Sequence, residues 1–123
     1  MKLIRSVVRL ILLLLHVMVG VGMTAVFVLL VSRSETNQIR WQQSVQWWQG
    51  RIIRVLGGIV IVKGEPLRSG ALIVSNHVSW MDIPLLGSQS FVRFLSKQDV
   101  ERWPVIGWLA TRAGTLYIER GRR

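Results

Sequence analysis

The sequence of 123 residues contains no cysteine, and only 6 of its residues are acidic. The lack of cysteine excludes disulfides and cysteine-ligated metal sites, and it leaves the redox compartment open. Against those few acids stand 16 lysines and arginines, so that the net charge is +10. Such an excess predicts an anionic partner, and nucleic acid and a membrane with anionic headgroups both fit it.

Charge is also absent from the whole segment between Leu10 and Val31, in which His16 and Thr24 are the markedly polar residues. A helix of about 20 apolar residues is long enough to cross a bilayer. A secretory signal peptide is the main alternative, but this run is longer than usual and no A-x-A cleavage pattern follows Val31. We therefore expect a retained membrane anchor, in which His16 is tolerated rather than functional, and an anionic phospholipid membrane as the partner instead of nucleic acid.

The orientation of this anchor stays open. Basic residues flank it on both sides, namely Lys2, Arg5 and Arg9 before it and Arg33, Arg40, Arg51 and Arg54 after it. The positive-inside rule therefore gives no direction. Gly20 and Gly22 either bend the segment into a half-inserted helix or lie within a straight one, so the sequence leaves open whether it spans the bilayer.

A second helix is expected from residue 35 to 56, after a capping box in which Ser32 precedes Glu35 by three positions. Its apolar residues recur at helical spacing and form one stripe, composed of Trp41, Val45, Trp48, Ile52 and Val55. Such a stripe either lies in the membrane interface or packs on neighbouring elements. Both alternatives stay open, and residues 1–56 are expected to form a membrane-anchoring unit.

Residues 57–123 have the pattern of a small α/β domain. Four strands are expected, at 59–62, 71–75, 91–96 and 115–118. Between them we expect a helix that begins near Asp82 and another from Asp99 to about Gly114, with Pro104 tolerated in its first turns. The expected fold class is thus α/β, a membrane-associated two-helix element followed by a truncated, mostly parallel sheet with crossover helices.

One short stretch, Asn76-His77-Val78-Ser79-Trp80-Met81-Asp82, places a histidine and a carboxylate five positions apart after the expected strand at 71–75. The Nδ1–H of His77 can donate to Asp82, which leaves Nε2 free to take a proton from an alcohol. The pair corresponds to two members of a catalytic triad, the base and the group that orients it, and it lacks the third member, a protein nucleophile. The plainer interpretation of the same spacing is a histidine that is hydrogen-bonded within a loop.

Two blocks of the chain resemble motifs of the glycerolipid acyltransferases, the family that includes 1-acylglycerol-3-phosphate (lysophosphatidic acid) acyltransferase. Asn76–Asp82 matches an NHxSxxD pattern, and Gly114–Arg120 resembles a glycine followed by a short strand that ends in an acidic residue and an arginine. Phe94–Lys97 and Trp103–Trp108 are similar to the segment that links the blocks in the family. The resemblance covers about residues 59–123.

The resemblance implies transfer of an acyl group from acyl-CoA or acyl-carrier protein to the free hydroxyl of a lysophospholipid, with no resident cofactor or metal. It implies that His77 is the general base, that Asp82 orients it, and that Arg120 holds the acceptor phosphate. Gly114 is implied to allow close backbone approach ahead of the strand. The other substrate-binding candidates by resemblance are Asn76, Ser79, Thr115 and Glu119.

The family's third block, a Glu-Gly-Thr stretch, and its proline-bearing fourth block are not found in this sequence. We therefore expect the N-terminal portion of such an enzyme, with little or no turnover by itself, at the cytoplasmic face of a bacterial inner membrane. Alternative acceptors are lyso-ornithine lipid and glycerol 3-phosphate. A non-catalytic basic membrane-surface protein is the alternative outside this class. A nucleic-acid binder is disfavoured, because the basic residues are dispersed among apolar elements.

Overall fold

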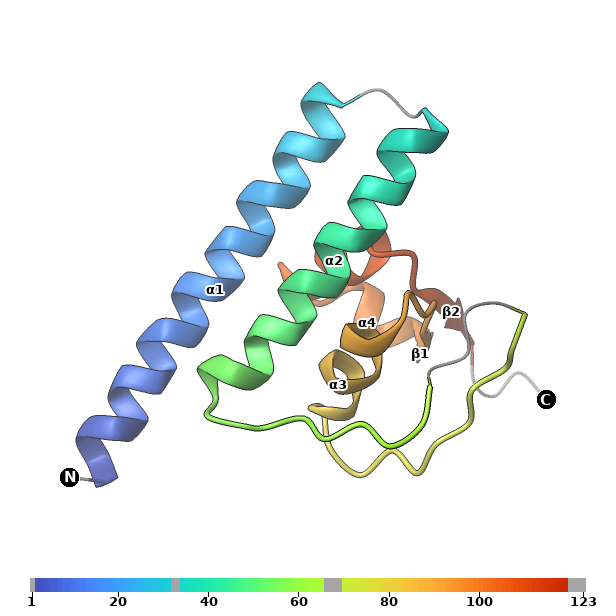
Figure 1. The fold of residues 1–123 in the computed structure, drawn as a ribbon. Helices are drawn as coiled ribbons and strands as arrows, with labels where there is room; N and C mark the ends of the chain where they lie inside the picture. The colour runs from blue at the N-terminus through green and yellow to red at the C-terminus, as the bar shows by residue number, and fades with distance from the viewer. Residues whose placement is uncertain (1, 32–33, 66–69, 120–123) are drawn as a thin grey trace.

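An antiparallel hairpin of two long helices dominates the computed structural model, which describes residues 2–31, 34–65 and 70–119 (Figure 1). Helix α1 runs from Lys2 to Leu30 and helix α2 from Glu35 to Val55. The expected apolar segment, except for its last residue Val31, lies within α1, which continues without a break through its glycines. Among the described residues, α1 alone is long and apolar enough to cross a membrane, by length and composition.

Helix α2 has a defined beginning and end. Its N-cap is Ser34, whose side-chain oxygen accepts a hydrogen bond from the backbone N–H of Asn37 at 3.3 Å. The cap is therefore two positions later than expected, and Ser32 lies outside the described residues. After α2, Gly57 has a φ of +80°, a conformation that favours glycine and ends the helix.

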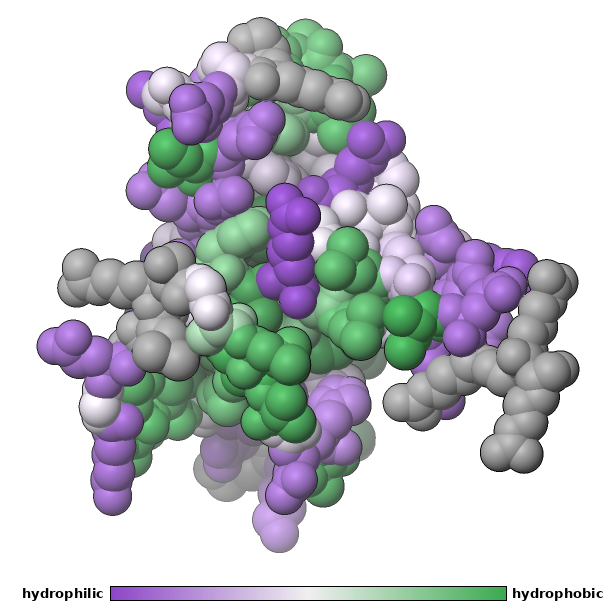
Figure 2. Space-filling view, turned by 90° about the vertical axis from the view of Figure 1, so that its right-hand side faces the viewer, coloured by the Kyte–Doolittle hydropathy of each residue, from purple (hydrophilic) through white to green (hydrophobic). Residues whose placement is uncertain are grey.

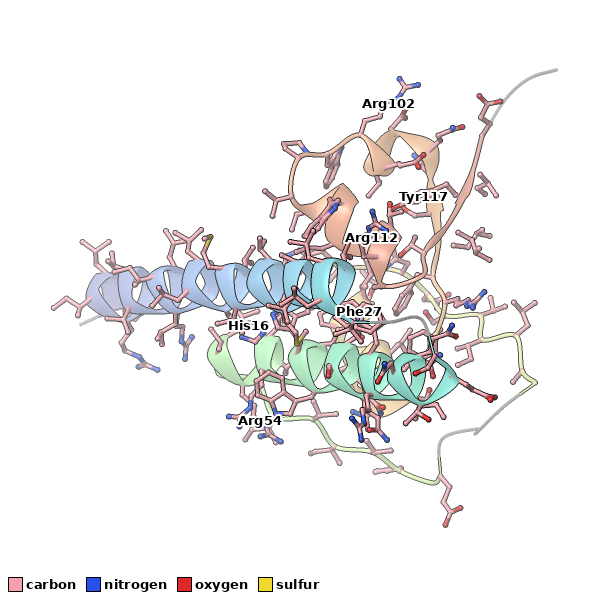
Figure 3. The ribbon with its side chains drawn as sticks, turned by 90° about the horizontal axis from the view of Figure 1, so that it is seen from above. His16, Phe27, Arg54, Arg102, Arg112 and Tyr117 are labelled. Carbon is pink, nitrogen blue, oxygen red and sulfur yellow. The ribbon has the colours of Figure 1, made fainter. Side chains whose placement is uncertain are left out.

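The apolar stripe of α2 packs inward, which favours the packing alternative over the interface alternative. The most buried apolar side chains of the described structure all lie on α2, namely Val45, Ile52 and Ile53. Two ring pairs join α2 to α1, Phe27 with Trp41 at 4.5 Å between centroids and His16 with Trp48 at 5.1 Å. Figure 3 shows His16 and Phe27 on the side of α1 that faces α2. The core therefore lies along the contact between the hairpin helices and on the adjoining face of α2.

The helix expected at the His/Asp motif is confirmed as α3, which runs from Asp82 to Gln89 and lies against α2. The side-chain amide of Gln46 donates to the carbonyl oxygen of Ser88 at 3.1 Å. Gly87 is buried, and a Cβ at this position would overlap the side-chain oxygen of Gln49. These two contacts hold the last turn of α3 against the C-terminal half of α2.

The expected parallel sheet is present, but it is small. Strand β1 is Leu95–Lys97 and strand β2 is Leu116–Ile118, and the two pair in parallel from their first residues. Helices α4, Gln98–Glu101, and α5, Ile106–Arg112, connect them. The expected strand at 115–118 is thus found in shortened form, whereas the one expected at 91–96 overlaps β1 only at Leu95 and Ser96.

The expected strands at 59–62 and 71–75 are wrong, because the chain has no regular secondary structure in either segment. Their apolar side chains are open to solvent, with Ile59 at 89% and Leu72 at 92% exposure. A strand is stable only where neighbours take its backbone hydrogen bonds and cover one face. Figure 2, which faces the side of the sheet and of these loops, shows hydrophobic side chains gathered at the surface.

The single helix expected from Asp99 to about Gly114 is also wrong, because α4 and α5 are separated by residues 102–105. Pro104 has no N–H to donate, and proline disfavours helical backbone in the residue before it. Val105 follows with a φ of +62°, which turns the chain sharply. Asp99 lies in the first turn of α4 rather than at its N-cap.

Candidate active site

His77 and Asp82 meet at the turn that leads into α3. The Nδ1 atom of His77 lies 3.1 Å from the Oδ2 atom of Asp82. The chain reverses between them, because the backbone N–H of Asp82 donates to the carbonyl oxygen of Ser79 at 3.0 Å. The pair predicted from sequence spacing is therefore in direct contact, although on a loop and not at the end of a strand.

Two backbone groups hold the Asp82 carboxylate in place. Its Oδ2 atom accepts hydrogen bonds from the N–H of Val78 at 2.8 Å and from the N–H of Ser79 at 2.9 Å. The Ser79 N–H lowers the pKa of Asp82 most, desolvation opposes this, and the Val78 N–H and the His77 ring lower it further. Asp82 is consequently ionised at neutral pH.

An ionised Asp82 determines the tautomer of neutral His77. The carboxylate has no proton to donate, so the 3.1 Å contact requires the proton to reside on Nδ1 of the imidazole. The lone pair of the neutral ring is then on Nε2. The side chain of His77 is 60% exposed and that of Asp82 is 28% exposed. The site can therefore offer an oriented base to a group that approaches from the surface.

The neighbouring candidates in the first block have different surroundings. The hydroxyl oxygen of Ser79 accepts a hydrogen bond from the backbone N–H of Met81 at 3.3 Å, so Ser79 helps to shape the turn. Asn76 is exposed beside His77. The backbone N–H groups of Val78 and Ser79 were not anticipated as part of the site, because backbone donors leave no signal in the residue types.

The second block lies around β2. Gly114 has a φ of +91°, and a Cβ added there would lie 3.8 Å from Cγ of Arg93, which is an ordinary contact. The positive φ therefore favours glycine at position 114. No other backbone atom lies within 4 Å of the added Cβ among the described residues, so the expected close approach of another backbone is not found there. Thr115 donates its N–H to the carbonyl oxygen of Ala110 at 3.1 Å and is partly buried.

Glu119 is exposed just after β2, and Arg120 lies outside the described residues. Within the described ranges, no hydrogen bond or ion pair joins the second block to His77 or Asp82. In the same ranges, no three side chains of His, Cys, Asp or Glu gather as a metal site. Two shallow hollows of the described surface flank Trp47 on α2, and neither is lined by His77.

Comparison with family models matches residues 59–123 to the family described as Acyltransferase. The chain is 51% identical over 80 residues to a lyso-ornithine lipid O-acyltransferase of Pseudomonas aeruginosa, a match that covers 65% of this chain and 31% of that protein. It is 40% identical over 55 residues to a 1-acyl-sn-glycerol-3-phosphate acyltransferase of Neisseria gonorrhoeae, with 45% and 22% of the two chains covered.

A lysophospholipid acyltransferase of Arabidopsis thaliana is 45% identical over 56 residues, which cover 46% of this chain and 14% of the plant protein. The matched segment spans less than a third of the length of each of these relatives. No solved structure matches the chain. The family match takes in more than half of the chain, including His77, Asp82 and the whole second block. This protein therefore belongs to the acyltransferase family.

Proposed function

We propose that this chain is part of an enzyme that transfers a fatty acyl group to the free hydroxyl of a lysolipid at a membrane surface. The observation that carries the proposal is the 3.1 Å contact between His77 Nδ1 and the ionised Asp82, which leaves the Nε2 lone pair to an incoming group on a side chain that is 60% exposed. Membership of the acyltransferase family gives this pair its chemical context.

In the proposed reaction, His77 acts as the general base. As the hydroxyl oxygen of the acceptor attacks the thioester carbonyl carbon, its proton passes to Nε2 of His77 and a C–O bond forms. The tetrahedral intermediate then breaks its C–S bond, and the leaving thiolate takes the proton from the imidazolium. Asp82 stabilises the imidazolium between these steps. No acyl-enzyme is needed, because the acceptor itself is the nucleophile.

The donor in this proposal is acyl-CoA or acyl-carrier protein, which serves as co-substrate, and no resident cofactor or metal takes part. Arg120 would hold the anionic group of the acceptor, which is the phosphate of 1-acylglycerol 3-phosphate or the ornithine carboxylate of lyso-ornithine lipid, since guanidinium matches the geometry of both groups. Residues 57–123 would supply the part of the acyltransferase domain that carries His77 and Asp82, and residues 1–56 would anchor this domain to the membrane. The length and composition of α1 support a membrane location.

Two acceptors are supported by the named relatives. Lyso-ornithine lipid is favoured by the P. aeruginosa protein, with 51% identity over 80 residues, and 1-acylglycerol 3-phosphate by the N. gonorrhoeae protein, with 40% over 55 residues. We place lyso-ornithine lipid first, because that match is both longer and closer.

A chimera tests the proposal, because the match covers only part of each relative. Residues 59–123 replace the corresponding segment of the P. aeruginosa relative, and the purified chimera is supplied with acyl-CoA and each lysolipid. Mass spectrometry should detect the diacylated product, with a preference for lyso-ornithine lipid as the acceptor. A chimera that is folded and binds lipid but forms no product from any acceptor contradicts the proposal.

The competing hypothesis is a non-catalytic basic membrane-surface protein in which His77 is structural. It predicts that replacing His77 and Asp82 leaves the lipid composition of the producing cells unchanged. The same measurement separates the two hypotheses, since a catalytic pair requires the acylated lipid to fall.

A further inference from the structure

Trp41 of α2 connects the hairpin to the segment that leads into the second block, Gly114–Arg120. Its Nε1–H donates to the carbonyl oxygen of Arg112, the last residue of α5, at 3.1 Å. The two residues are 71 positions apart in the chain. Because the second block begins directly after this helix end, the hydrogen bond fixes the point from which the block starts.

The carbonyl group of Arg112 gains in Trp41 a partner that the end of α5 does not supply. The last four carbonyl groups of a helix have no partner within the helix itself. In α5, the carbonyl oxygens of Leu109, Ala110 and Thr111 accept backbone N–H groups of the turn that follows. The next carbonyl, that of Arg112, accepts the indole N–H instead. A side chain of α2 therefore completes the C-terminal end of α5.

The ring of Trp41 is itself held in place. It stacks on Phe27 of α1, with 4.5 Å between the ring centroids and 14° between the ring planes. Helix α5 also lies against α1. A stacked ring has little freedom to turn, so its N–H stays directed at one acceptor. Trp41 is only partly buried, so filling the core does not by itself account for this arrangement.

Tyr117 continues the connection from α5 into β2. The hydroxyl of Thr111 donates to the carbonyl oxygen of Gly107 at 2.8 Å, and it therefore accepts the hydrogen bond from the Tyr117 hydroxyl at 3.0 Å. Figure 3 shows Arg112 and Tyr117 on the same side of the hairpin. Since Tyr117 belongs to the second block, the position of α5 on the hairpin determines the position of that block.

Helix α2 holds the first block by a separate contact. Gln46 donates to the carbonyl oxygen of Ser88 in α3, and Asp82 lies in the first turn of the same helix. Trp41 and Gln46 are five residues apart, which corresponds to about 7.5 Å along the axis of α2 and about 140° around it. One continuous helix thus fixes both blocks, each through a different face.

We propose that Trp41 is a positioning residue for the transfer reaction, because its N–H fixes the second block relative to His77 and Asp82. The inference rests on the function proposed above, in which the first block supplies the base and the second block holds the anionic group of the acceptor. Loss of the N–H allows the second block to move and leaves the His77–Asp82 contact intact. Acceptor binding is therefore impaired, whereas proton transfer to His77 is not.

Two matched substitutions isolate this hydrogen bond. Trp41→Phe keeps a ring against Phe27 and removes the donor to Arg112, whereas Trp48→Phe keeps a ring against His16 and removes the donor to its carbonyl oxygen. Both are made in a chimera that joins residues 1–123 to the part of the P. aeruginosa relative that follows the matched segment. Thermal unfolding of each chimera shows that it is folded.

The kinetic constants separate positioning from a general loss of stability. W41F should raise the KM for lyso-ornithine lipid roughly fivefold, the effect of one hydrogen bond. Its kcat and the pH profile of kcat should stay within about twofold of the parent chimera, because the base and its orienting carboxylate are unchanged. W48F should lower the unfolding temperature and leave the KM within about twofold of the parent.

A distance measurement in the 123-residue chain needs no turnover. Because the sequence has no cysteine, pairs of spin labels can be attached at chosen exposed positions. Gln43→Cys with Leu116→Cys measures the distance from α2 to β2, and Gln43→Cys with Leu85→Cys measures the distance from α2 to α3. In detergent micelles, W41F should broaden the first distance distribution and leave the second unchanged. W48F should leave both unchanged.

Three results overturn the proposal. They are equal increases of KM in W41F and W48F, a parental KM for W41F in an active chimera, and an unchanged α2–β2 distance distribution in W41F. An active parent chimera with either of the first two results leaves the proposed function standing. A folded parent chimera without turnover contradicts the proposed function, and the distance measurement then still decides whether Trp41 positions the second block.

Discussion

His16 and Trp48 hold the two hairpin helices together through a pair of reciprocal hydrogen bonds. Nε1 of Trp48 donates to the carbonyl oxygen of His16 at 2.9 Å, and Nε2 of His16 lies 2.9 Å from the carbonyl oxygen of Trp48. The rings stack within 8° of parallel. His16 was expected only to be tolerated in an apolar helix, but it satisfies polar groups of both helices where they touch.

This contact predicts that Trp48→Ala loosens the hairpin. The substitution removes a stacked ring and leaves a carbonyl group without its donor, so we expect a loss of about 3 kcal/mol in the free energy of unfolding. Thermal unfolding in detergent micelles, followed by circular dichroism, measures it. Trp47→Ala is the matched control and should cost less than about 1 kcal/mol. Equal effects of the two substitutions would argue against the observed pairing.

The two glycines in the middle of α1 should respond differently to alanine. A Cβ on Gly20 would lie 2.6 Å from Cε2 of the Trp48 ring, whereas nothing lies within 4 Å of one on Gly22. Gly20→Ala should therefore cost about 1–3 kcal/mol of hairpin stability. Gly22→Ala should be neutral or stabilise by up to about 1 kcal/mol, because alanine is the better helix former. The same micelle unfolding assay compares them, and a reversed order would contradict the packing at Gly20.

The decrease in the free energy of unfolding at acidic pH should depend on Asp82. Its pKa is lowered in the folded state, chiefly by the Ser79 N–H, so ionised Asp82 stabilises the fold above the pKa of the unfolded chain, about 3.9. This contribution is lost as the pH falls through the lower folded pKa. Asp82→Asn should make the free energy of unfolding depend less on pH between these two pKa values, which denaturant titrations at a series of acidic pH values would measure.

Catalysis should depend on His77 in the chimera described above. We expect His77→Ala to lower kcat by roughly 10²–10⁴-fold, the usual contribution of a general base. Ser75→Ala, an exposed substitution two residues away, should leave kcat within twofold of the parent chimera. A His77→Ala chimera with undiminished turnover would remove His77 from the proposed mechanism.

Local patterns were sufficient for part of the fold and of the site. The spacing of apolar residues predicted α1 and α2, and the His-x4-Asp spacing predicted a contact that the structure contains. Chemistry between residues five apart needs only one local turn, so sequence distance is informative there. The N–H groups of Val78 and Ser79 escaped prediction because every residue except proline has one.

Non-local pairing was the main source of error. The apolar runs at 59–62 and 71–75 have strand composition, but strand formation depends on partners elsewhere in the chain and on a covered face. The expected helix after Asp99 failed at Pro104, where the backbone constraint outweighs the apolar pattern. The short β1–β2 pair was predictable because its parallel connection is made by the helices between the strands.

The sequence by itself determined an apolar helix, an amphipathic helix with one apolar stripe, and a histidine and aspartate within reach of one another. Each of these follows from the local periodicity of the backbone. Tertiary structure alone decided that the apolar stripe of α2 packs inward, since burial depends on the partner helix that lies against it. It also brought Arg9 to the end of α2, because an antiparallel turn joins cations that the chain keeps more than forty residues apart.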